Sequence, residues 1–249
     1  MNGLKQVSMA LATAGVLASG VAQAALIDRG GGLLYDDILG VTWLQDANYA
    51  ATQFAATGGT KGDADGLMTW SAAKVWASNL NISRFPGESL SGWRLAANTP
   101  VGTSWNPSFS TDGSTDFAFN ITSQASELSY MYYVNLGLKG YYSPDGAYQP
   151  NFGVFGNGTM GGQRNVYPVK NLRSYAYWSA TPKTSSYAWY FDTLLGKQSY
   201  NPKSEDFYAW AVRDGNVAAV PEPEVYAMLL AGLGLLGVVA RRRKQQSAV

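Results

Sequence analysis

The stretch "YAYWSATPKTSSYAWYFDTLLGKQSYN", residues 175–201, decides the fold class of this chain. Its segments 175–181 and 186–193 are rich in the aromatic residues that favour strands, and "QSYN" continues the second segment across a turn that holds Gly196. The segment "FYAWAVRD", residues 207–214, has the same composition. The stretch shows no βαβ alternation, so the sequence predicts closely spaced antiparallel strands at this end of the folded region.

The helix predictions lie upstream of these strands. In "TWSAAKVWASNL", residues 69–80, apolar side chains recur at the spacing of one helix face, and Thr69 is a candidate N-cap. A shorter helix is expected in "DANYAATQFAAT", residues 46–57, with Asp46 as its cap. A third, in "SQASELSYMYYVNLGL", residues 123–138, carries a similar apolar stripe. Helices early and strands late indicate an α+β fold with a small antiparallel sheet and two or three helices.

The remaining segments predict short strands and loops. Residues 26–44 are typical of two short strands around an Asp-rich turn, and "GWRLAA", residues 92–97, is typical of a buried strand. Residues 98–116 predict a loop, and residues 140–173 predict long loops with short strands. The tryptophans on the periodic segments are expected to form the buried core: Trp43, Trp70, Trp76 and Trp93.

The composition excludes several classes of function. The chain has neither histidine nor cysteine, so Ser-His-Asp and Cys-His catalytic sites and the usual zinc sites cannot be built. Lys and Arg number 18 against 17 Asp and Glu, which gives no basic patch for nucleic acid. We therefore expect a protein that is not an enzyme, that has no cofactor and that binds no nucleic acid. Aromatic residues at 13% and charged residues at 14% fit a large aromatic core, and they also fit a surface that faces carbohydrate.

The first residues have the pattern of a secretory signal peptide. Residues 1–24 contain Lys5, an uncharged stretch of small and apolar residues, and the cleavage pattern "AQA" at its end. The mature chain is expected to begin near Ala25 and to fold as one domain over residues 25–217.

Six segments in their order along the chain resemble the Lcl C-terminal-like domain family of bacterial surface proteins. They are "LIDRGGGLLYDDILGVTWLQDANYA", "GLMTWSAAKVWASNL", "GWRLAA", "SELSYMYYVNLGL", "YWSAT" and "AWAVRDG". The resemblance implies a C-type-lectin-like α+β fold in which the first and last strands pair and two helices pack on a small sheet. It does not extend to calcium-dependent sugar binding, because the Glu-Pro-Asn and Trp-Asn-Asp ligand motifs of such lectins are absent.

The C-terminal stretch has three parts: a linker over residues 218–224 with a Pro-Glu-Pro element, an apolar segment over residues 225–240, and a basic tail over residues 241–249. It resembles the PEP-CTERM sorting signals of Gram-negative bacteria that make exopolysaccharide. The residues that carry this resemblance are Pro221, Glu222, Pro223, Arg241, Arg242, Arg243 and Lys244. The resemblance implies that an exosortase, a protease of the inner membrane, removes the tail near the Pro-Glu-Pro element.

Physical chemistry agrees with this interpretation. The apolar segment 225–240 would form a helix of about 24 Å, which spans the hydrocarbon core of a membrane only marginally. The cations that follow it stay on the cytoplasmic side. The expectation is export through the inner membrane, a transient anchor there, and release to the cell surface or extracellular matrix. A permanent anchor is the alternative, although it leaves the Pro-Glu-Pro element without a role.

Candidate ligand-binding residues lie in the loops. Trp105, Tyr141, Tyr142 and Tyr148 are aromatic residues on which a flat sugar ring of exopolysaccharide or another glycan can stack. Trp189 and Tyr190 are further candidates, with burial in the core as the alternative. The leading hypothesis is an adhesive or polysaccharide-binding protein, and the rivals are a glycan hydrolase that uses two carboxylates and a purely structural matrix subunit.

Two weaker patterns involve carboxylates. Asp63-Ala64-Asp65-Gly66 has the start of a calcium loop but lacks its later ligands, and an ordinary turn is the stronger interpretation. The carboxylates available to a hydrolase are scattered along the chain, and nothing in the sequence brings two together: Asp36, Asp37, Glu88, Asp192, Glu205 and Asp206.

Overall fold

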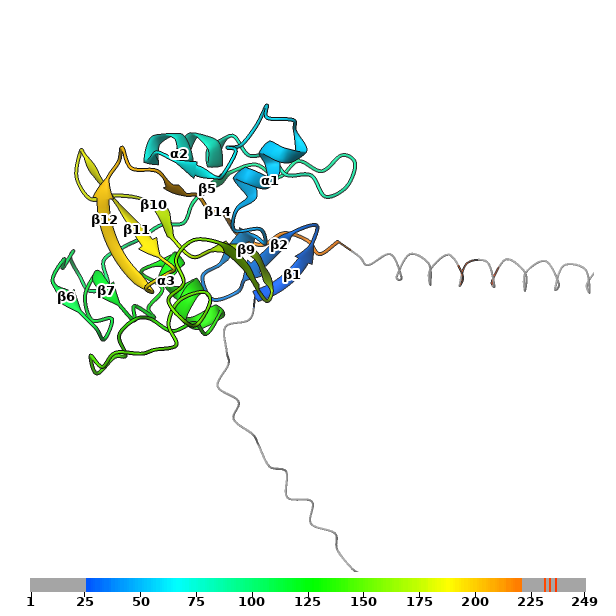
Figure 1. Ribbon diagram of the computed structural model, residues 1–249. Coiled ribbons are helices and arrows are strands. Elements are labelled where there is room, and N and C mark those ends of the chain that lie inside the picture. Colours follow the sequence, from blue (N-terminus) through cyan, green and yellow to red (C-terminus); the bar gives the residue numbers. More distant parts are fainter. Residues whose placement is uncertain (1–25, 221–230, 232, 234–235, 237–249) are drawn as a thin grey trace, which may run out of the picture.

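The computed structural model describes residues 26–220 together with Ala231, Leu233 and Leu236. The predicted signal peptide, the Pro-Glu-Pro element and the basic tail lie outside the described residues, as does the predicted membrane span apart from those three positions. Across the described part of the chain, no helix combines the length and apolar character needed to cross a membrane. The described chain forms an α+β fold in which strands predominate (Figure 1).

The first sheet joins the N-terminal strands to the last strand of the domain. Its order is β1-β2-β3-β14-β5, all antiparallel, and its strands are β1 Leu26–Gly30, β2 Leu33–Asp36, β3 Val41–Leu44, β14 Ala211–Asp214 and β5 Trp93–Leu95. The predicted pair of strands at the N-terminus is therefore a three-stranded meander. The last strand pairs with β3 and β5, so the expectation that it pairs with the first strand is wrong.

The second sheet is larger, and it corrects the expectation of one small antiparallel sheet. Its order is β4-β13-β10-β11-β12-β7-β6, with parallel pairing at β10–β13 and β6–β7. The strands are β4 Leu67–Met68, β13 Phe207–Tyr208, β10 Ala176–Pro182, β11 Tyr187–Asp192, β12 Lys197–Pro202, β7 Phe117–Phe119 and β6 Phe109–Ser110. A separate hairpin consists of β8 Gln163–Val166 and β9 Val169–Arg173.

The segment 207–214, predicted as one strand, is divided between the two sheets. β13 belongs to the second sheet and β14 to the first, and the chain changes sheet at Ala209 and Trp210. Trp210 is buried at this change, where its Nε1 donates to the carbonyl of Leu44 (2.7 Å) and its ring lies edge-on to Trp43. Burial of this indole with its N–H paired explains why the strand breaks here without exposing apolar surface.

Within residues 26–220, three short helices accompany the sheets. They are α1 Tyr49–Ala56, α2 Trp70–Ser78 and α3 Glu127–Tyr130, and α3 continues as a wider π-turn, η1 Met131–Asn135. The predicted cap of α2 is confirmed, because the Thr69 side chain accepts the N–H of Ala72. The predicted cap of α1 is wrong, because Asn48 holds the cap position and Asp46 instead accepts from the Thr52 hydroxyl (2.6 Å).

The core contains three of the four tryptophans predicted for it. Trp43, Trp70 and Trp93 are buried, whereas Trp76 is half-buried and donates from Nε1 to Gln53 Oε1 (3.1 Å). Trp76 lies beside the buried stripe of α2 rather than on it, which explains its exposure. The stripe itself is confirmed: Trp70, Ala73, Ala77 and Leu80 are all buried.

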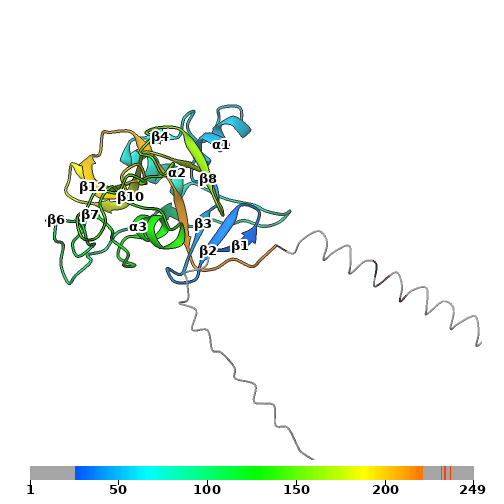
Figure 2. The same cartoon turned by 60° about the horizontal axis from the view of Figure 1, so that its bottom comes forward.

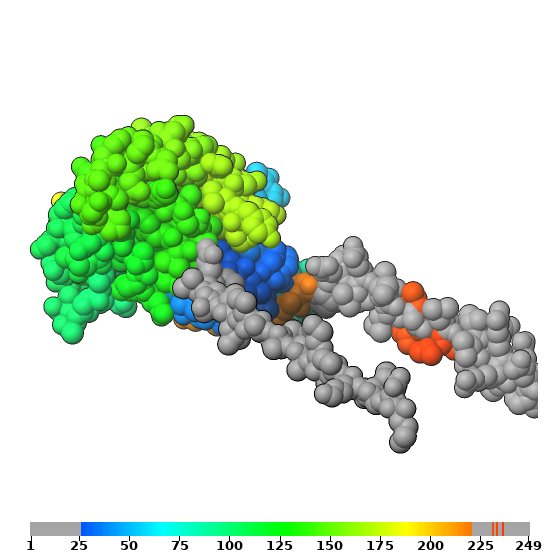
Figure 3. All heavy atoms as spheres, turned by 90° about the horizontal axis from the view of Figure 1, so that it is seen from below, coloured from blue at the N-terminus to red at the C-terminus, as the bar shows by residue number. Residues whose placement is uncertain are grey.

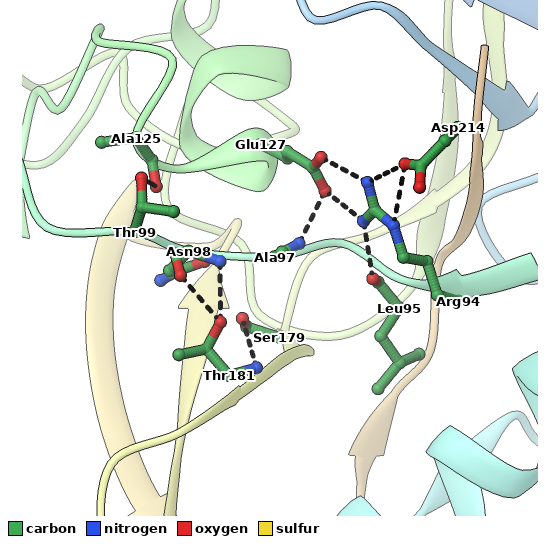
Figure 4. A network of polar contacts seen from close by, with 10 residues as sticks. All are labelled: Arg94, Leu95, Ala97, Asn98, Thr99, Ala125, Glu127, Ser179, Thr181 and Asp214. Carbon is green, nitrogen blue, oxygen red and sulfur yellow. Dashed lines mark hydrogen bonds and ion pairs between the residues drawn. The ribbon is translucent and has the colours of Figure 1, made fainter.

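An ion-pair network fixes the first sheet to α3 (Figure 4). Arg94 in β5 donates through both terminal nitrogens to the Glu127 carboxylate at 2.8 Å, and its Nη2 also reaches Asp214 in β14 at 2.6 Å. Glu127 in turn accepts the backbone N–H of Ala97 (2.6 Å). The arginine of "GWRLAA" thus joins three elements that are distant in sequence.

Candidate functional site

Trp105 stands on a loop that a buried carboxylate holds in place. Its ring stacks on Trp189 of β11, with centroids 5.3 Å apart and planes 19° apart, and 38% of the residue is exposed. Asp116 is fully buried, and its carboxylate accepts the backbone N–H groups of Val101 (2.6 Å) and Asn106 (2.5 Å). Because these bonds close the loop on both sides of Trp105, the exposed indole is held in one position.

Aromatic side chains continue from Trp105 over the neighbouring strands. Trp189 pairs directly with Tyr200 of β12, so both rings lie on one face of the sheet, with centroids 5.4 Å apart. Tyr200 contacts Phe117 of β7 (5.7 Å), which in turn contacts Phe109 of β6 (6.4 Å). Tyr187 of β11 joins the series through Tyr200, with ring centroids 6.3 Å apart. We call the partly or largely exposed members of this series the aromatic band: Trp105, Phe109, Phe117, Tyr187 and Tyr200. β6, β7 and β12 lie side by side at one end of the molecule (Figures 1 and 2).

The three candidate tyrosines form a cluster next to the band. Tyr141 contacts Tyr142 and Tyr148 with ring centroids 4.8 and 4.9 Å apart, and Tyr148 is largely exposed. Phe119 connects the cluster to the band, since its ring lies 5.2 Å from Tyr142 and 6.0 Å from Phe109. The four predicted ligand-binding residues, Trp105 and the three tyrosines, thus belong to one connected series of aromatic rings.

The two further candidates do not present exposed rings to this series. Trp189 is fully buried and serves as the support beneath Trp105. Tyr190, the next residue, projects to the other face of β11, where its ring contacts Phe207 (4.8 Å).

Lysines give the aromatic band a positive edge. Lys183 places Nζ 5.3 Å from the ring centroid of Trp189 and 5.7 Å from that of Tyr200. Lys197 places Nζ 5.0 Å from the centroid of Phe117. These are cation–π distances, so ammonium groups lie beside two rings of the band, Tyr200 and Phe117, and beside the buried ring of Trp189.

A hollow between α1 and α2 was not predicted from the sequence. It has a volume of about 500 Å³, and Trp76, Gln53, Val75, Asn79 and Lys61 are among the residues that line it. The signal that could have indicated it is the place of Trp76 beside the buried stripe of α2.

Three of the six candidate hydrolase carboxylates have structural partners. Glu88 forms an ion pair with Arg84, Asp36 accepts from the Asn135 amide (2.6 Å), and Asp192 accepts the backbone N–H of Leu194 (2.8 Å). Burial raises the pKa of both Asp36 and Asp192.

The candidate calcium loop is a hydrogen-bonded turn. Asp63 accepts the backbone N–H of Gly66 (3.1 Å), and Asp65 accepts that of Leu67 (2.9 Å). The part of the chain that the structure describes contains no group of three or more acidic side chains placed to hold a metal ion.

Comparison with known proteins bears on the C-terminal stretch. A family model described as the PEP-CTERM protein-sorting motif matches residues 219–244. No curated protein and no solved structure matches the chain. The chain therefore carries the sorting signal of an exosortase substrate, which indicates an exported protein that is processed and delivered to the cell surface.

Proposed function

We propose that the protein is exported through the inner membrane of a Gram-negative bacterium and cut by an exosortase, and that it then binds exopolysaccharide or another glycan at the cell surface or in the extracellular matrix. The aromatic band is the observation that carries the glycan-binding part of this proposal. The match at residues 219–244 supports the sorting part. The C-type-lectin-like assignment of the domain belongs to the same proposal and rests on the six quoted segments.

The band has the physical properties that a polysaccharide surface requires. The flat face of a sugar ring carries apolar C–H groups that pack on an indole or phenyl ring. Trp105 and Phe109 expose 38% and 58% of their surface, and Trp105 stacks on the buried ring of Trp189. A series of rings along neighbouring strands offers successive sugar units successive contacts, which suits a chain better than a single sugar.

Charge indicates the class of glycan. Lys183 and Lys197 stand beside the rings of the band, where they can pair with carboxylate groups of an acidic polysaccharide. The tyrosine cluster extends the same surface beyond Phe109. We propose an acidic chain as the preferred ligand.

Binding without catalysis is part of the proposal, and so is the absence of a cofactor and of a nucleic-acid partner. Three of the candidate hydrolase carboxylates, Glu88, Asp36 and Asp192, already serve structural partners, which favours binding over hydrolysis. A glycan hydrolase and a purely structural matrix subunit remain the rivals, and they differ in what they do to an added glycan.

One experiment separates the three. Processed protein is incubated with an acidic and a neutral polysaccharide, and both retention and release of reducing ends are measured. We expect retention without release, lost in Trp105→Ala and kept in Phe85→Ala, which removes an exposed aromatic residue outside the band. Release of reducing ends that a single Asp or Glu substitution abolishes would establish the hydrolase, and neither retention nor release would favour the structural subunit.

A further inference from the structure

The last described residues of the domain lie along the first strand instead of leaving the surface. Val217 is buried, and the N–H of Val220 donates to the carbonyl of Arg29 in β1 (2.9 Å). Arg29 Nε donates to the Asn216 side chain (2.9 Å). We call residues 216–220 the C-terminal strap. Figure 3 shows this segment, in orange, beside the blue N-terminal strand.

One guanidinium ties the strap to the domain. Arg84 Nη1 donates to the carbonyls of both Arg29 (3.0 Å) and Ala218 (2.8 Å), and its Nε donates to Glu88 Oε2 (2.9 Å). The Arg84 side chain is 2% exposed. A buried arginine with its donors satisfied in this way fixes the geometry of everything that it touches.

The glycine-rich turn after β1 makes room for this arrangement. A Cβ atom at Gly31 would overlap the Arg84 side chain, and one at Gly30 would lie 3.1 Å from Cβ of Val220. Both glycines have positive φ, at +72° for Gly30 and +62° for Gly31. The strap therefore adds a steric reason for the first two glycines of "RGGG", besides the positive φ that the turn between β1 and β2 requires.

The strap overlaps the sorting motif. The family match begins at Ala219, so its first two residues lie in the strap, and Val220 is still hydrogen-bonded to the domain. From Val220 to the end of the Pro-Glu-Pro element is three residues, which span at most about 10 Å when fully extended. Any enzyme that holds this element must meet the face of the domain that carries the strap.

We infer that this strap face is the surface through which the domain contacts exosortase during processing, an inference that rests on the proposed sorting function. Phe85 provides the exposed anchor on this face: it is 47% exposed, and the Arg84 guanidinium lies 5.8 Å from its ring. Arg29 lies on the same face: its backbone carbonyl accepts the N–H of Val220, and its side chain is a cation. Exposed aromatic and arginine side chains are the residues that protein interfaces favour.

The test follows conversion of full-length precursor to the processed form by pulse–chase in an exosortase-bearing host. Phe85→Asp should slow conversion several-fold, and Met160→Asp, the same kind of change at an exposed apolar residue outside the strap face, should convert at the wild-type rate. The wild-type chain and Phe85→Asp are also prepared with an insertion of ten Gly and Ser residues between Val220 and Pro221. This linker is long enough to separate the domain from the enzyme. With that insertion, Phe85→Asp should convert as fast as its parent.

The outcomes are distinct. If Phe85→Asp without the insertion converts at the wild-type rate, the strap-face inference is wrong. If Phe85→Asp converts equally slowly with and without the insertion, the inference is also wrong, because the defect then lies in folding or export. Absence of any conversion of the wild-type chain would instead contradict the proposed sorting function.

Discussion

The indole of Trp105 lies almost parallel to that of Trp189, 5.3 Å away, so that a fully buried ring supports an exposed one. Stacking of this kind holds the exposed ring in one orientation without covering its outer face. A ligand that binds this outer face does not have to immobilise the Trp105 side chain. The entropy cost of binding is therefore smaller, which raises the affinity.

Asp116 should control this arrangement. In Asp116→Ala, the backbone N–H groups of Val101 and Asn106 lose their acceptor in a buried site, and we expect a loss of about 2–3 kcal/mol in the free energy of unfolding. Urea denaturation followed by tryptophan fluorescence measures it, and the native-state emission should shift because Trp105 is released. Asp112→Ala, an exposed change in the same loop, is the control and should stay near wild type. Equal stability of the two variants would contradict the account.

Lys183 should affect acidic ligands selectively. Its Nζ lies near the rings of both Trp189 and Tyr200, so Lys183→Gln removes a cation from the edge of the band without removing a ring. Affinity for an acidic polysaccharide should fall, and the salt dependence of binding should weaken, while affinity for a neutral chain changes little. Isothermal titration at two salt concentrations measures this. Equal losses for both chains would show that charge has no part in recognition.

Arg94 should matter for stability through its geometry as well as its charge. Arg94→Lys keeps the charge but cannot make the paired bonds to Glu127, and we expect a loss of about 1–2 kcal/mol in the free energy of unfolding. Asp214→Asn removes the more exposed partner and should cost less than about 0.5 kcal/mol. Thermal and urea unfolding measure both losses. A larger loss for Asp214→Asn than for Arg94→Lys would contradict the prediction that the bonds to Glu127 contribute more than the ion pair with Asp214.

Acid should release the C-terminal strap. The hydrogen bond from Arg84 holds the pKa of Glu88 below its ordinary value of 4.5, and the charges of Arg84 and Arg213 act in the same direction. Because folding lowers the pKa of Glu88, its ionised carboxylate stabilises the folded form, and this stabilisation is complete at pH values above the ordinary pKa. The stabilisation is lost as the pH falls through the lowered pKa of the folded form. Protection of the Val220 amide from hydrogen exchange should therefore drop at acid pH, below 4.5.

Glu88→Gln provides the comparison for the acid release. Because the neutral amide already lacks the charge that holds Arg84, protection at Val220 should be weaker near neutral pH and should change less on acidification. A wild-type chain that keeps full protection through the acid range would show that the Arg84–Glu88 pair does not hold the strap.

The sequence predicted those elements whose signal is local. The apolar spacing of α2 and its Thr69 cap are properties of one helix, and both are confirmed. The turn at Gly196 between β11 and β12 is equally local and is also confirmed. The division of residues 207–214 could not be predicted, because the change of sheet depends on the Trp210 indole reaching Leu44, which is distant in sequence.

The candidate site shows the same limit. Trp105 and the three tyrosines could be identified because they are aromatic residues in predicted loops. Phe109, Phe117 and Phe119 lie on strands that are too short to show the alternation of a strand in the sequence. Those phenylalanines connect Trp105 to the tyrosines, and the connection exists only once β6, β7 and β12 are paired. The carboxylate of Asp116 gave no signal at all, because its role is to accept backbone N–H groups.

The most direct test of the account is the intact mass of the protein isolated from a native, exosortase-bearing host. The account predicts an N-terminus near Ala25 and a C-terminus at or close to Pro221–Pro223, with or without an added group, and it predicts that substitution of Glu222 leaves the chain uncut and held in the membrane. Mature protein at the cell surface that still carries the C-terminal tail, residues 224–249, would contradict this prediction.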